Sequence, residues 1–367
     1  MIPFNNSESN KPIALSKFDH RSNGPHSALC EELLNRETGY TKSFLTPSGT
    51  SSLEIIAQFL AMRGIHTIII PSFTFTTSVL PFLERKIQVK FCDVDAETGS
   101  VRIEDVARAY DKNVGALLAV SYGGALPSQE ALLRFCEQKN IMYFEDNAQA
   151  IGNIGFDKET TIKPLAMMSA MSFHYTKNIS CGEGGALLTD VEQSQEIYEI
   201  VDKGTNRKKF LNGEVDKYTC TSFGSSHIMS ELNAYLLHHE LQHVHETTIS
   251  RRKQWLKYAN ALHGAYRFIL NTQYENLNMC PSNGHIFGIL SKTSSDRDYL
   301  QNFLASKGIQ TATHYHALSE NKFLLKFLNK VDCPNSMKLQ NTILRLPLGK
   351  HVSDEDQDKI ISVLSNI

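Results

Sequence analysis

Lys177 is the residue of this chain whose neighbours point most directly to chemistry. It lies in the run MSFHYTKNISCGEGG, between a strand-like stretch and a Gly-rich turn. Upstream, an apolar stretch at 141–144 ends in the run EDNAQ, which contains Asp146 and Gln149. This order places a carboxylate and an amide at the carboxyl end of a strand, where open α/β sheets bind ligands. We therefore expect Lys177 and Asp146 to face the same ligand.

A lysine amine and a nearby carboxylate are the two groups that pyridoxal phosphate chemistry requires. The amine forms a Schiff base, and the carboxylate keeps the pyridine nitrogen protonated so that the ring accepts electrons. Burial beside a cationic ring lowers the pKa of a lysine, which leaves part of the amine deprotonated and able to attack. The simpler interpretations are a surface position for Lys177 and a helix N-cap for Asp146.

The motifs and their order resemble the DegT-type sugar-nucleotide aminotransferases of aminotransferase fold-type I. Besides the lysine and EDNAQ runs, the resemblance rests on Ser48-Gly49-Thr50 and on PSFTF at 71–75, and it extends from the start of the chain to RLPL at 345–348. The segment 202–226 is similar to the branch that makes dTDP-4-amino-4,6-dideoxygalactose. The resemblance implies that Lys177 is the catalytic Schiff-base lysine and that Asp146 binds the pyridine nitrogen.

The resemblance also implies which residues hold the cofactor's phosphate. Thr50 and Ser51 enter a helix, whose free N–H groups and positive end suit an anion. Ser172, five residues before Lys177, occupies the position of a second phosphate contact. By itself a Gly-Thr turn is also a common helix cap, so these assignments depend on the family.

Three further cofactor contacts follow from the same resemblance. Gln149 is expected to contact the phenolic oxygen, and Phe75 to stack on the ring, although a core position at a strand end is the simpler interpretation for Phe75. Ser226 occupies a position where family members often carry an asparagine that reaches the phosphate in the neighbouring subunit. We therefore expect a homodimer with shared active sites.

Candidate substrate-binding residues lie in three segments. Arg207, Lys217 and Tyr218 belong to the segment that resembles the 4-amino branch, and an arginine fork suits a pyrophosphate, although solvated loop charges have the same pattern. Tyr315 lies in HYHALS at 314–319, where the family has a loop over the sugar but with a proline and a histidine that this chain lacks. His174, three residues before Lys177, is expected near the site.

Alternation of helix and strand patterns predicts an α/β fold with a mainly parallel central sheet, as in fold-type I. We expect a large cofactor-binding domain at 1–240 and a smaller C-terminal α/β domain at 241–367. The patterns predict strands at 66–71, 89–94, 116–121, 141–145, 185–189 and 285–290. They predict helices at 48–62, 128–139, 192–201, 229–263, 296–306 and 353–364.

Composition limits the partners of the chain. It has 367 residues, 41% of them hydrophobic, with 37 basic against 39 acidic residues and a net charge of −2. Without a basic run, nucleic acid and anionic membranes are disfavoured as main partners. No run reaches the ~20 apolar residues of a membrane span, and the first residues lack the pattern of a signal peptide. Seven scattered cysteines without a CxxC pair fit a reducing compartment, so we expect a cytoplasmic protein.

The residues and the resemblance together predict a pyridoxal phosphate-dependent aminotransferase. Its substrates are expected to be glutamate, the donor used in the family, and a nucleotide-linked 4-keto-6-deoxyhexose such as dTDP-4-keto-6-deoxyglucose. Its product would enter bacterial surface polysaccharides such as the O-antigen of lipopolysaccharide. Two half-reactions at one site predict ping-pong kinetics. The nucleotide and the axial or equatorial position of the new amine stay open.

Alternative functions also stay open. The amine could be added at C3, whereas a 3-dehydratase is disfavoured because such enzymes replace the lysine with histidine. A non-catalytic sensor of pyridoxal phosphate would have the same fold. The run HELQH at 239–243 satisfies H-E-x-x-H, so that on a helix His239 and His243 could bind zinc in a hydrolase. With no clear third ligand downstream, we expect no metal site.

Overall fold

The largest element of the fold is a seven-stranded sheet of order β1-β7-β6-β5-β4-β2-β3. The computed structural model describes residues 1–4, 23–154, 165–190, 194–269 and 282–367. The strands are β1 (Lys42–Thr46), β2 (Thr67–Pro71), β3 (Gln88–Cys92), β4 (Ala116–Val120), β5 (Met142–Asp146), β6 (Met168–Ser172) and β7 (Gly185–Thr189). β7 is antiparallel to β1 and β6, and the other pairs are parallel, so the predicted mainly parallel sheet is confirmed.

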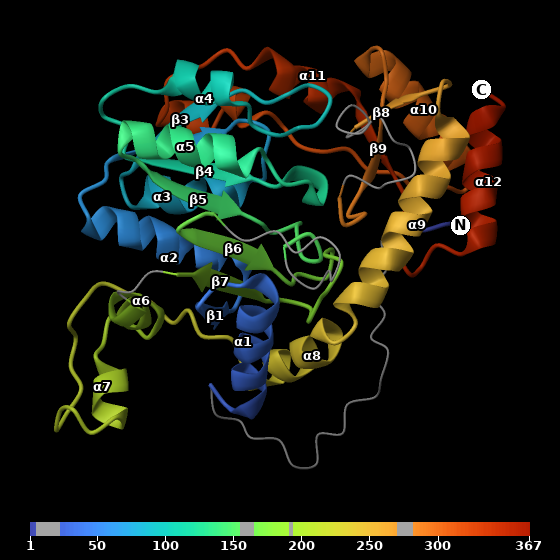
Figure 1. Ribbon diagram of the computed structural model, residues 1–367. Helices are drawn as coiled ribbons and strands as arrows, with labels where there is room; N and C mark the ends of the chain where they lie inside the picture. The colour runs from blue at the N-terminus through green and yellow to red at the C-terminus, as the bar shows by residue number, and fades with distance from the viewer. Residues whose placement is uncertain (5–22, 155–164, 191–193, 270–281) are drawn as a thin grey trace.

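Helices cover both faces of this sheet (Figure 1). One face packs against α2 (Gly49–Met62), α3 (Leu80–Glu84) and α6 (Ser194–Val201). The other face packs against α1 (Pro25–Thr38), α4 (Ile103–Ala109), α5 (Gln129–Lys139) and α8 (Glu231–Leu241). Because both faces are covered, β4, with the sequence ALLAV, is buried and apolar throughout, as is typical of strands in parallel sheets.

Local sequence explains where two of the central elements begin and end. β2 has the sequence TIIIP, and all of its residues are buried, which fits the preference of β-branched side chains for strands. α2 begins after Ser48, whose side chain accepts a hydrogen bond of 3.1 Å from the backbone N–H of Ser51. This N-cap fixes the start of the helix at the edge of the sheet where β6 ends.

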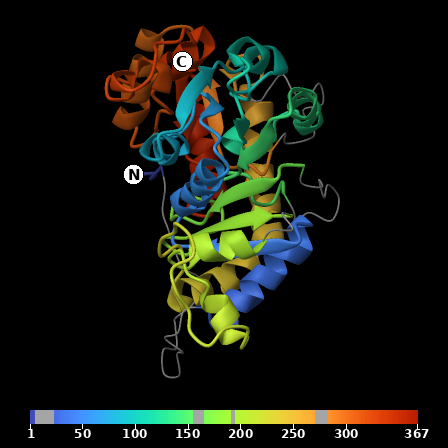
Figure 2. The same cartoon turned by 90° about the vertical axis from the view of Figure 1, so that its left-hand side faces the viewer.

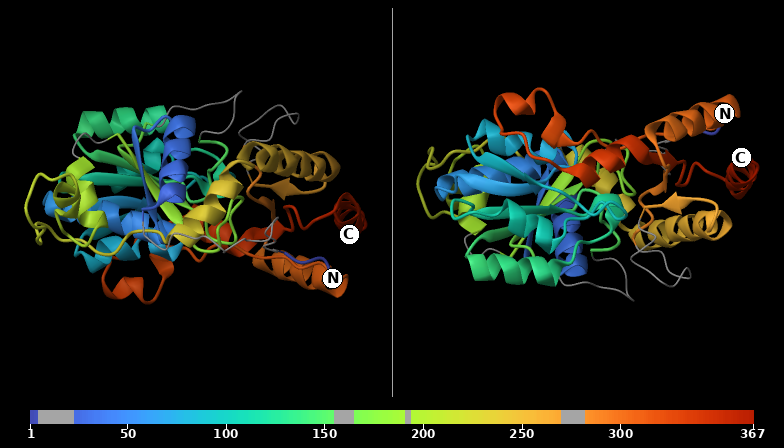
Figure 3. Two further views of the ribbon diagram at one scale, coloured as in Figure 1. Left: turned by 90° about the horizontal axis from the view of Figure 1, so that it is seen from below. Right: turned by 90° about the horizontal axis from the view of Figure 1, so that it is seen from above.

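The C-terminal part forms a three-stranded antiparallel sheet of order β10-β9-β8. Its elements are α9 (Val244–Leu262), β8 (Arg267–Phe268), β9 (Phe287–Leu290), α10 (Ser294–Ser306), α11 (Pro334–Thr342), β10 (Ile343–Leu346) and α12 (Asp354–Ser365). Both views in Figure 3 show the two termini at the same end of the molecule, beside these C-terminal helices. One hydrophobic core cluster contains Leu117 of the large sheet together with Tyr258 and Phe287 of the C-terminal part. The domain boundary between residues 240 and 241 stays a prediction.

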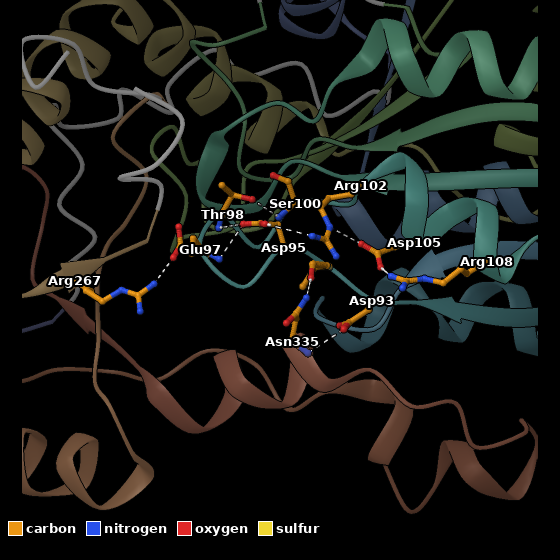
Figure 4. A network of polar contacts seen from close by, with 11 residues as sticks. Asp93, Asp95, Glu97, Thr98, Ser100, Arg102, Asp105, Arg108, Arg267 and Asn335 are labelled. Carbon is orange, nitrogen blue, oxygen red and sulfur yellow. Dashed lines mark hydrogen bonds and ion pairs between the residues drawn. The ribbon is translucent and has the colours of Figure 1, made fainter. Parts of the chain in front are cut away.

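A polar network ties the C-terminal part to the edge of the large sheet (Figure 4). Asp93, just after β3, accepts hydrogen bonds of 2.9 and 2.8 Å from the backbone N–H groups of Asn335 and Ser336 at the start of α11. A carboxylate at a helix N-terminus satisfies donors that have no partner within the helix. Nearby, Arg267 of β8 forms an ion pair with Glu97.

Among the parts of the chain that the structure describes, no helix is both long and apolar enough to cross a membrane. The longest, α9, has 19 residues but contains five charged side chains, Glu246, Arg251, Arg252, Lys253 and Lys257.

The prediction of one continuous helix over 229–263 is wrong. This stretch is broken into α8 and α9, with Gln242 and His243 between them.

Candidate active site

Asp146 is the last residue of β5 and lies buried at the carboxyl end of the parallel strands. Its Oδ2 accepts a hydrogen bond of 2.7 Å from Ser78 Oγ, and its Oδ1 accepts one of 3.1 Å from the backbone N–H of Ala148. Burial raises the pKa of Asp146, while these two donors and the charge of Lys177 lower it. The hydrogen bonds fix both carboxylate oxygens and orient the group.

Lys177 follows β6 and is partly buried in the turn that connects β6 to β7. Burial lowers the pKa of Lys177 to about 8, the carboxylate of Asp146 opposes this shift, and the charge of Arg345 adds to it. At pH 7 about a tenth of the amine is therefore uncharged, which is far more than for an exposed lysine. The structure thus brings together the two residues that the sequence singled out, and it leaves the amine able to attack a carbonyl.

The turn that carries Lys177 is held by its own backbone. The N–H of Lys177 donates to the carbonyl of His174 over 2.8 Å, and the N–H of Tyr175 donates to the carbonyl of Gly182 over 2.8 Å. Gly182 has a φ of +87°, a conformation that favours glycine. The Gly-rich run after the lysine is therefore needed to close this turn.

The N-terminus of α2 lies directly against the end of β6 and the start of β7. A Cβ on Gly49 would lie 2.9 Å from Cβ of Ser172, and a Cβ on Gly185 would lie 2.4 Å from the backbone carbon of Ser48. Two glycines therefore permit the close approach of these backbones. Thr50 and Ser51, both partly exposed, are the next residues of this helix turn. The helix N-terminus and the Ser172 hydroxyl are a fitting cradle for a phosphate.

Gln149 and Phe75 both lie near Tyr315. The side-chain amide of Gln149 donates to the hydroxyl of Tyr315 over 2.8 Å, and its carbonyl accepts from the N–H of Gly123 over 2.8 Å. The rings of Phe75 and Tyr315 have centroids 6.1 Å apart. Phe75 is 55% exposed, so its simpler interpretation as a core residue is wrong. An exposed aromatic ring at this edge of the sheet fits a stacking position.

The other proposed substrate residues lie outside this group. Arg207 forms an ion pair of 3.5 Å with Asp202. Lys217 and Tyr218 are exposed on the segment 202–226, called the arm below, which includes α7 (Arg207–Leu211). Figures 1 and 2 show this arm extending away from the C-terminal part. Ser226 is also exposed and pairs through its backbone with Asp202. Within one subunit these residues are not brought to Lys177.

His174 lies on the Lys177 turn, but its side chain makes other contacts. Its Nδ1 is 2.9 Å from Thr176 Oγ1, and its Nε2 is 3.4 Å from a carboxylate oxygen of Glu183.

The hypothesis of a zinc site at HELQH, residues 239–243, requires one continuous helix. His243 instead lies beyond the end of α8, and its Nδ1 is 3.3 Å from Glu246. Among the described residues there is no group of three metal-binding side chains.

The structure adds residues to the site that sequence reasoning missed. Ser78 binds Asp146, as described above, and Tyr122 and His314 join Tyr315 in one aromatic cluster. Arg345, quoted above only as part of a motif, interacts electrostatically with Lys177. These contacts join residues that are far apart in the sequence, so no local sequence pattern indicates them.

A lysine amine, a buried carboxylate at a parallel sheet edge and an anion cradle beside them define the site of a pyridoxal phosphate-dependent transferase. The chain belongs to the DegT/DnrJ/EryC1/StrS aminotransferase family, whose model matches residues 6–365. This membership confirms the predicted enzyme class, an aminotransferase of this family, and with it the predicted cofactor, pyridoxal phosphate.

Solved structures are similar to this chain in fold, and a curated protein is similar to it in sequence. CalS13, a sugar aminotransferase from Micromonospora echinospora, is 18% identical with a TM-score of 0.86, over 100% of both chains. Helicobacter pylori PseC, an aminotransferase of pseudoaminic acid biosynthesis, is 19% identical with a TM-score of 0.84, over 95% of this chain and 92% of PseC. An uncharacterized protein of Methanocaldococcus jannaschii is 24% identical over 98% of this chain and 94% of its own length.

Proposed function

We propose that this aminotransferase moves an amino group from glutamate to C4 of a nucleotide-linked 4-keto-6-deoxyhexose, dTDP-4-keto-6-deoxyglucose in particular. The observation that carries the amino transfer is the electrostatic pairing of Lys177 with the buried Asp146. The choice of sugar rests on the similarity of segment 202–226 to the 4-amino branch. The product would serve bacterial surface polysaccharide synthesis.

Each residue of the site has a task in this proposal. Pyridoxal phosphate, when bound, supplies an electron-accepting ring and a carbonyl that carries the amino group between substrates. Asp146 would hold the ring nitrogen protonated, and Gln149 would bind the phenolic oxygen. Lys177 tethers the cofactor and moves the proton at the substrate carbon. Its pKa of about 8 suits a base that works near neutral pH.

The remaining contacts hold the cofactor in place. Thr50, Ser51 and Ser172 would bind the phosphate with hydroxyl and N–H donors, and Phe75 would stack on the ring. The orientation matters because Lys177 must approach the same carbon in both half-reactions. The close packing of Gly49 against Ser172 supports this arrangement, since it brings the two phosphate-binding segments together.

The proposal includes a homodimer with shared active sites. The arm carries four of the proposed contact residues, Arg207, Lys217, Tyr218 and Ser226. It also has several exposed apolar side chains, among them Phe210, Leu211 and Phe223, which are 40%, 66% and 78% exposed. An apolar arm of this kind fits against another protein surface better than it fits in water. A second subunit would bring these substrate and phosphate contacts to the cofactor. We also propose a cytoplasmic location, which the six free cysteines of the described residues favour.

The function is tested by mixing the purified protein with dTDP-4-keto-6-deoxyglucose and glutamate and determining the product by NMR. An amine at C4, formed together with 2-oxoglutarate, is the expected result, and the coupling constants of H4 give its axial or equatorial position. An amine at C3 would replace the proposal by the 3-aminotransferase alternative. If the protein reacts with none of the dTDP-, UDP- and GDP-linked sugars, the substrate assignment is refuted. Lys177→Ala is the inactive control.

A further inference from the structure

Residues 282–285, with the sequence SNGH, form a buried segment just before β9 that contacts both motif loops of the site. We call this segment the clamp. Arg251 of α9 donates to the carbonyls of Gly284 and His285 over 3.0 and 2.8 Å. Gly284 has a φ of +67°, and a Cβ on it would lie 2.7 Å from the backbone carbon of Arg251, so this close contact requires glycine. The clamp is therefore fixed to α9 in the C-terminal part.

Asn283 of the clamp binds the loop that carries Gln149. Its buried side-chain amide donates two hydrogen bonds of 2.7 Å, to the carbonyls of Gln149 and Ile151. Its Oδ1 accepts from the N–H of His285 over 3.1 Å, so both amide hydrogens and the oxygen have partners. The amide fits here because Gly124 has no side chain, since a Cβ on Gly124 would overlap Oδ1 of Asn283. One buried amide therefore fixes the backbone of the loop from which the side chain of Gln149 projects.

The same clamp binds the turn that carries Lys177. Asn178, the residue after Lys177, donates from its side-chain amide to the carbonyl of Asn283 over 3.3 Å. The Oδ1 of Asn178 lies 2.9 Å from Nδ1 of His285. Because the amide nitrogen of Asn178 already donates to Asn283, its oxygen is the acceptor, and Nδ1 of His285 carries the proton. Two hydrogen bonds from one side chain therefore join the lysine turn to the clamp.

His285 has no charge at neutral pH. Burial, followed by the charge of Lys177, is the main cause that moves the pKa of His285 well below its usual value. An effect of this rank from Lys177 fits an imidazole ring close to the lysine amine. The charge of Lys177 interacts with titratable groups from separate elements, namely Asp146, His285, His314 and Arg345. Because its ring is neutral, His285 acts on Lys177 through position and not through charge.

We propose that Asn283 and His285 are positioning residues, which set where Gln149 and Lys177 lie relative to each other. This inference rests on the proposed function, because it uses the tasks given there to Lys177 and Gln149. These two side chains act on different atoms of one cofactor ring, so a small displacement of either would cost rate. Hydrogen bonds that reach both loops from one fixed segment keep the spacing of the two loops constant.

Loss of the clamp contact should change the pKa of Lys177. Burial is the main cause that lowers this pKa to about 8. A turn released from His285 lets water reach the amine, and better solvation of the charged form raises the pKa. The attraction of Asp146 would weaken in the same change and act in the opposite direction, but it is smaller than the effect of burial. The expected net shift of the pKa is therefore upward.

The test begins with two replacements of His285 in the full-length protein. His285→Phe keeps a flat ring, removes the donor to Asn178 and removes no charge, so a changed pKa of Lys177 must come from a changed position. The pH midpoint for capture of pyridoxal phosphate by cofactor-free protein should rise by about 0.5 to 1 unit. The cofactor should also leave the holoenzyme about tenfold faster. His285→Gln, whose amide can donate to Asn178, should recover most of the wild-type behaviour.

A double-mutant cycle shows whether one hydrogen bond carries the effect. Asn178→Leu removes both bonds of that side chain to the clamp, so it should raise the midpoint at least as far as His285→Phe, and it tests the contact without disturbing the buried ring. The combined variant should be no worse than Asn178→Leu alone, because the bond is already lost. Hydrogen exchange of the holoenzymes, followed by mass spectrometry, should quicken at 173–182 in these variants. In Asn283→Ala it should quicken at 147–154.

Ser336→Ala is the matched control. The hydroxyl of Ser336 donates to Asp93 over 2.7 Å and also joins the C-terminal part to the large sheet, but at the edge strand β3. This variant should lower the melting temperature and leave the midpoint and the exchange of both loops unchanged.

Two outcomes would overturn the inference. One is a His285→Phe variant that melts at a lower temperature but has the wild-type midpoint, since that shows a role in stability alone. The other is an additive effect of the two substitutions in the cycle. Failure of the proposed function looks different, because then Lys177→Ala has the same visible cofactor absorption as the wild-type holoenzyme.

Discussion

The hydroxyl of Ser78 donates a hydrogen bond of 2.7 Å to Oδ2 of Asp146, which joins the loop after β2 to the end of β5. The same hydroxyl lies 2.9 Å from Thr74 Oγ1, so it has partners on two sides and little freedom to rotate. The bond favours the ionised form of Asp146 and opposes the effect of burial on the pKa of Asp146. Ser78 is thus a positioning residue for the carboxylate.

Ser78→Ala should shift the acid limb of the pH–activity profile to higher pH. Removing a donor to the carboxylate leaves burial less opposed, so the pKa of Asp146 rises and the ionised form is lost at a higher pH. We expect kcat/KM at pH 6 to fall about tenfold, with a smaller loss at pH 8. Steady-state profiles check this, with Ser306→Ala, an exposed serine on α10, as control. A uniform loss at every pH would contradict the electrostatic explanation.

Lys177→Ala should bind pyridoxal phosphate but lose at least about 10³-fold of its turnover, because the lysine is both the tether and the proton carrier. Equilibrium dialysis measures cofactor binding, and product NMR measures turnover. Lys112→Ala removes an exposed lysine and should retain full activity. Full activity of Lys177→Ala would assign the proton transfer to another group.

Asp146→Asn should keep the fold and lose about 10²-fold in kcat, since an amide cannot hold the ring nitrogen protonated by charge. The amide oxygen can accept from the N–H of Ala148, and the amide NH2 can donate to Ser78 Oγ, whose hydroxyl can turn to Thr74 Oγ1, so melting temperature should change little. Asp111→Asn, at an exposed ion pair with Lys90, is the control. Near-normal turnover of Asp146→Asn at neutral pH would show that a different residue supports the ring.

The rate at which cofactor-free protein captures pyridoxal phosphate should depend on the pKa of Lys177. Only the uncharged amine attacks, so the rate should rise with pH and level off above about 8. Asp146→Asn should move this midpoint to lower pH, because the carboxylate raises the pKa of Lys177. Arg345→Gln should move it to higher pH, because Arg345 lowers that pKa. Stopped-flow absorption measures these midpoints, and two shifts of the same sign would refute the assigned couplings.

Cofactor binding should strengthen the dimer if Ser226 reaches the cofactor phosphate of the partner subunit. Whatever binds only the assembled form stabilises it by mass action. Sedimentation of the cofactor-free and cofactor-bound protein over a dilution series should give a lower dimer dissociation constant with cofactor, and Ser226→Ala should reduce the difference. Equal dissociation constants for both forms of the wild-type protein would remove this linkage.

The parts of the fold that sequence could predict are those fixed by local pattern. The strand predicted at 66–71 is found as Thr67–Pro71, and the strand at 185–189 is found as Gly185–Thr189, because buried apolar runs allow few alternatives. The break between α8 and α9 was missed, since neither Gln242 nor His243 is a helix breaker. Histidine spacing therefore suggested a metal helix that the backbone does not form.

The candidate site likewise contains some residues that the sequence could predict and others that it could not. Lys177 and Asp146 could be found because each lies in a motif beside its own strand. The contact of Gln149 with Tyr315 joins residues 166 positions apart, and that of Ser78 with Asp146 joins residues 68 positions apart. Such pairs are set by how strands are ordered in the sheet and by where the C-terminal part docks. A single sequence without homologues does not determine them.

The position of β1 has a consequence for how the protein is made. β1 is an edge strand whose partner is β7, so that Lys42 pairs with Thr189. During synthesis on a ribosome, residues 42–46 emerge long before β7, the strand that they pair with, and Phe44 emerges long before Tyr198, whose ring it contacts. Long-range pairing of this kind slows folding and leaves a strand open to wrong contacts. The nascent chain is therefore expected to be a client of ribosome-associated chaperones until the lysine turn and β7 have emerged.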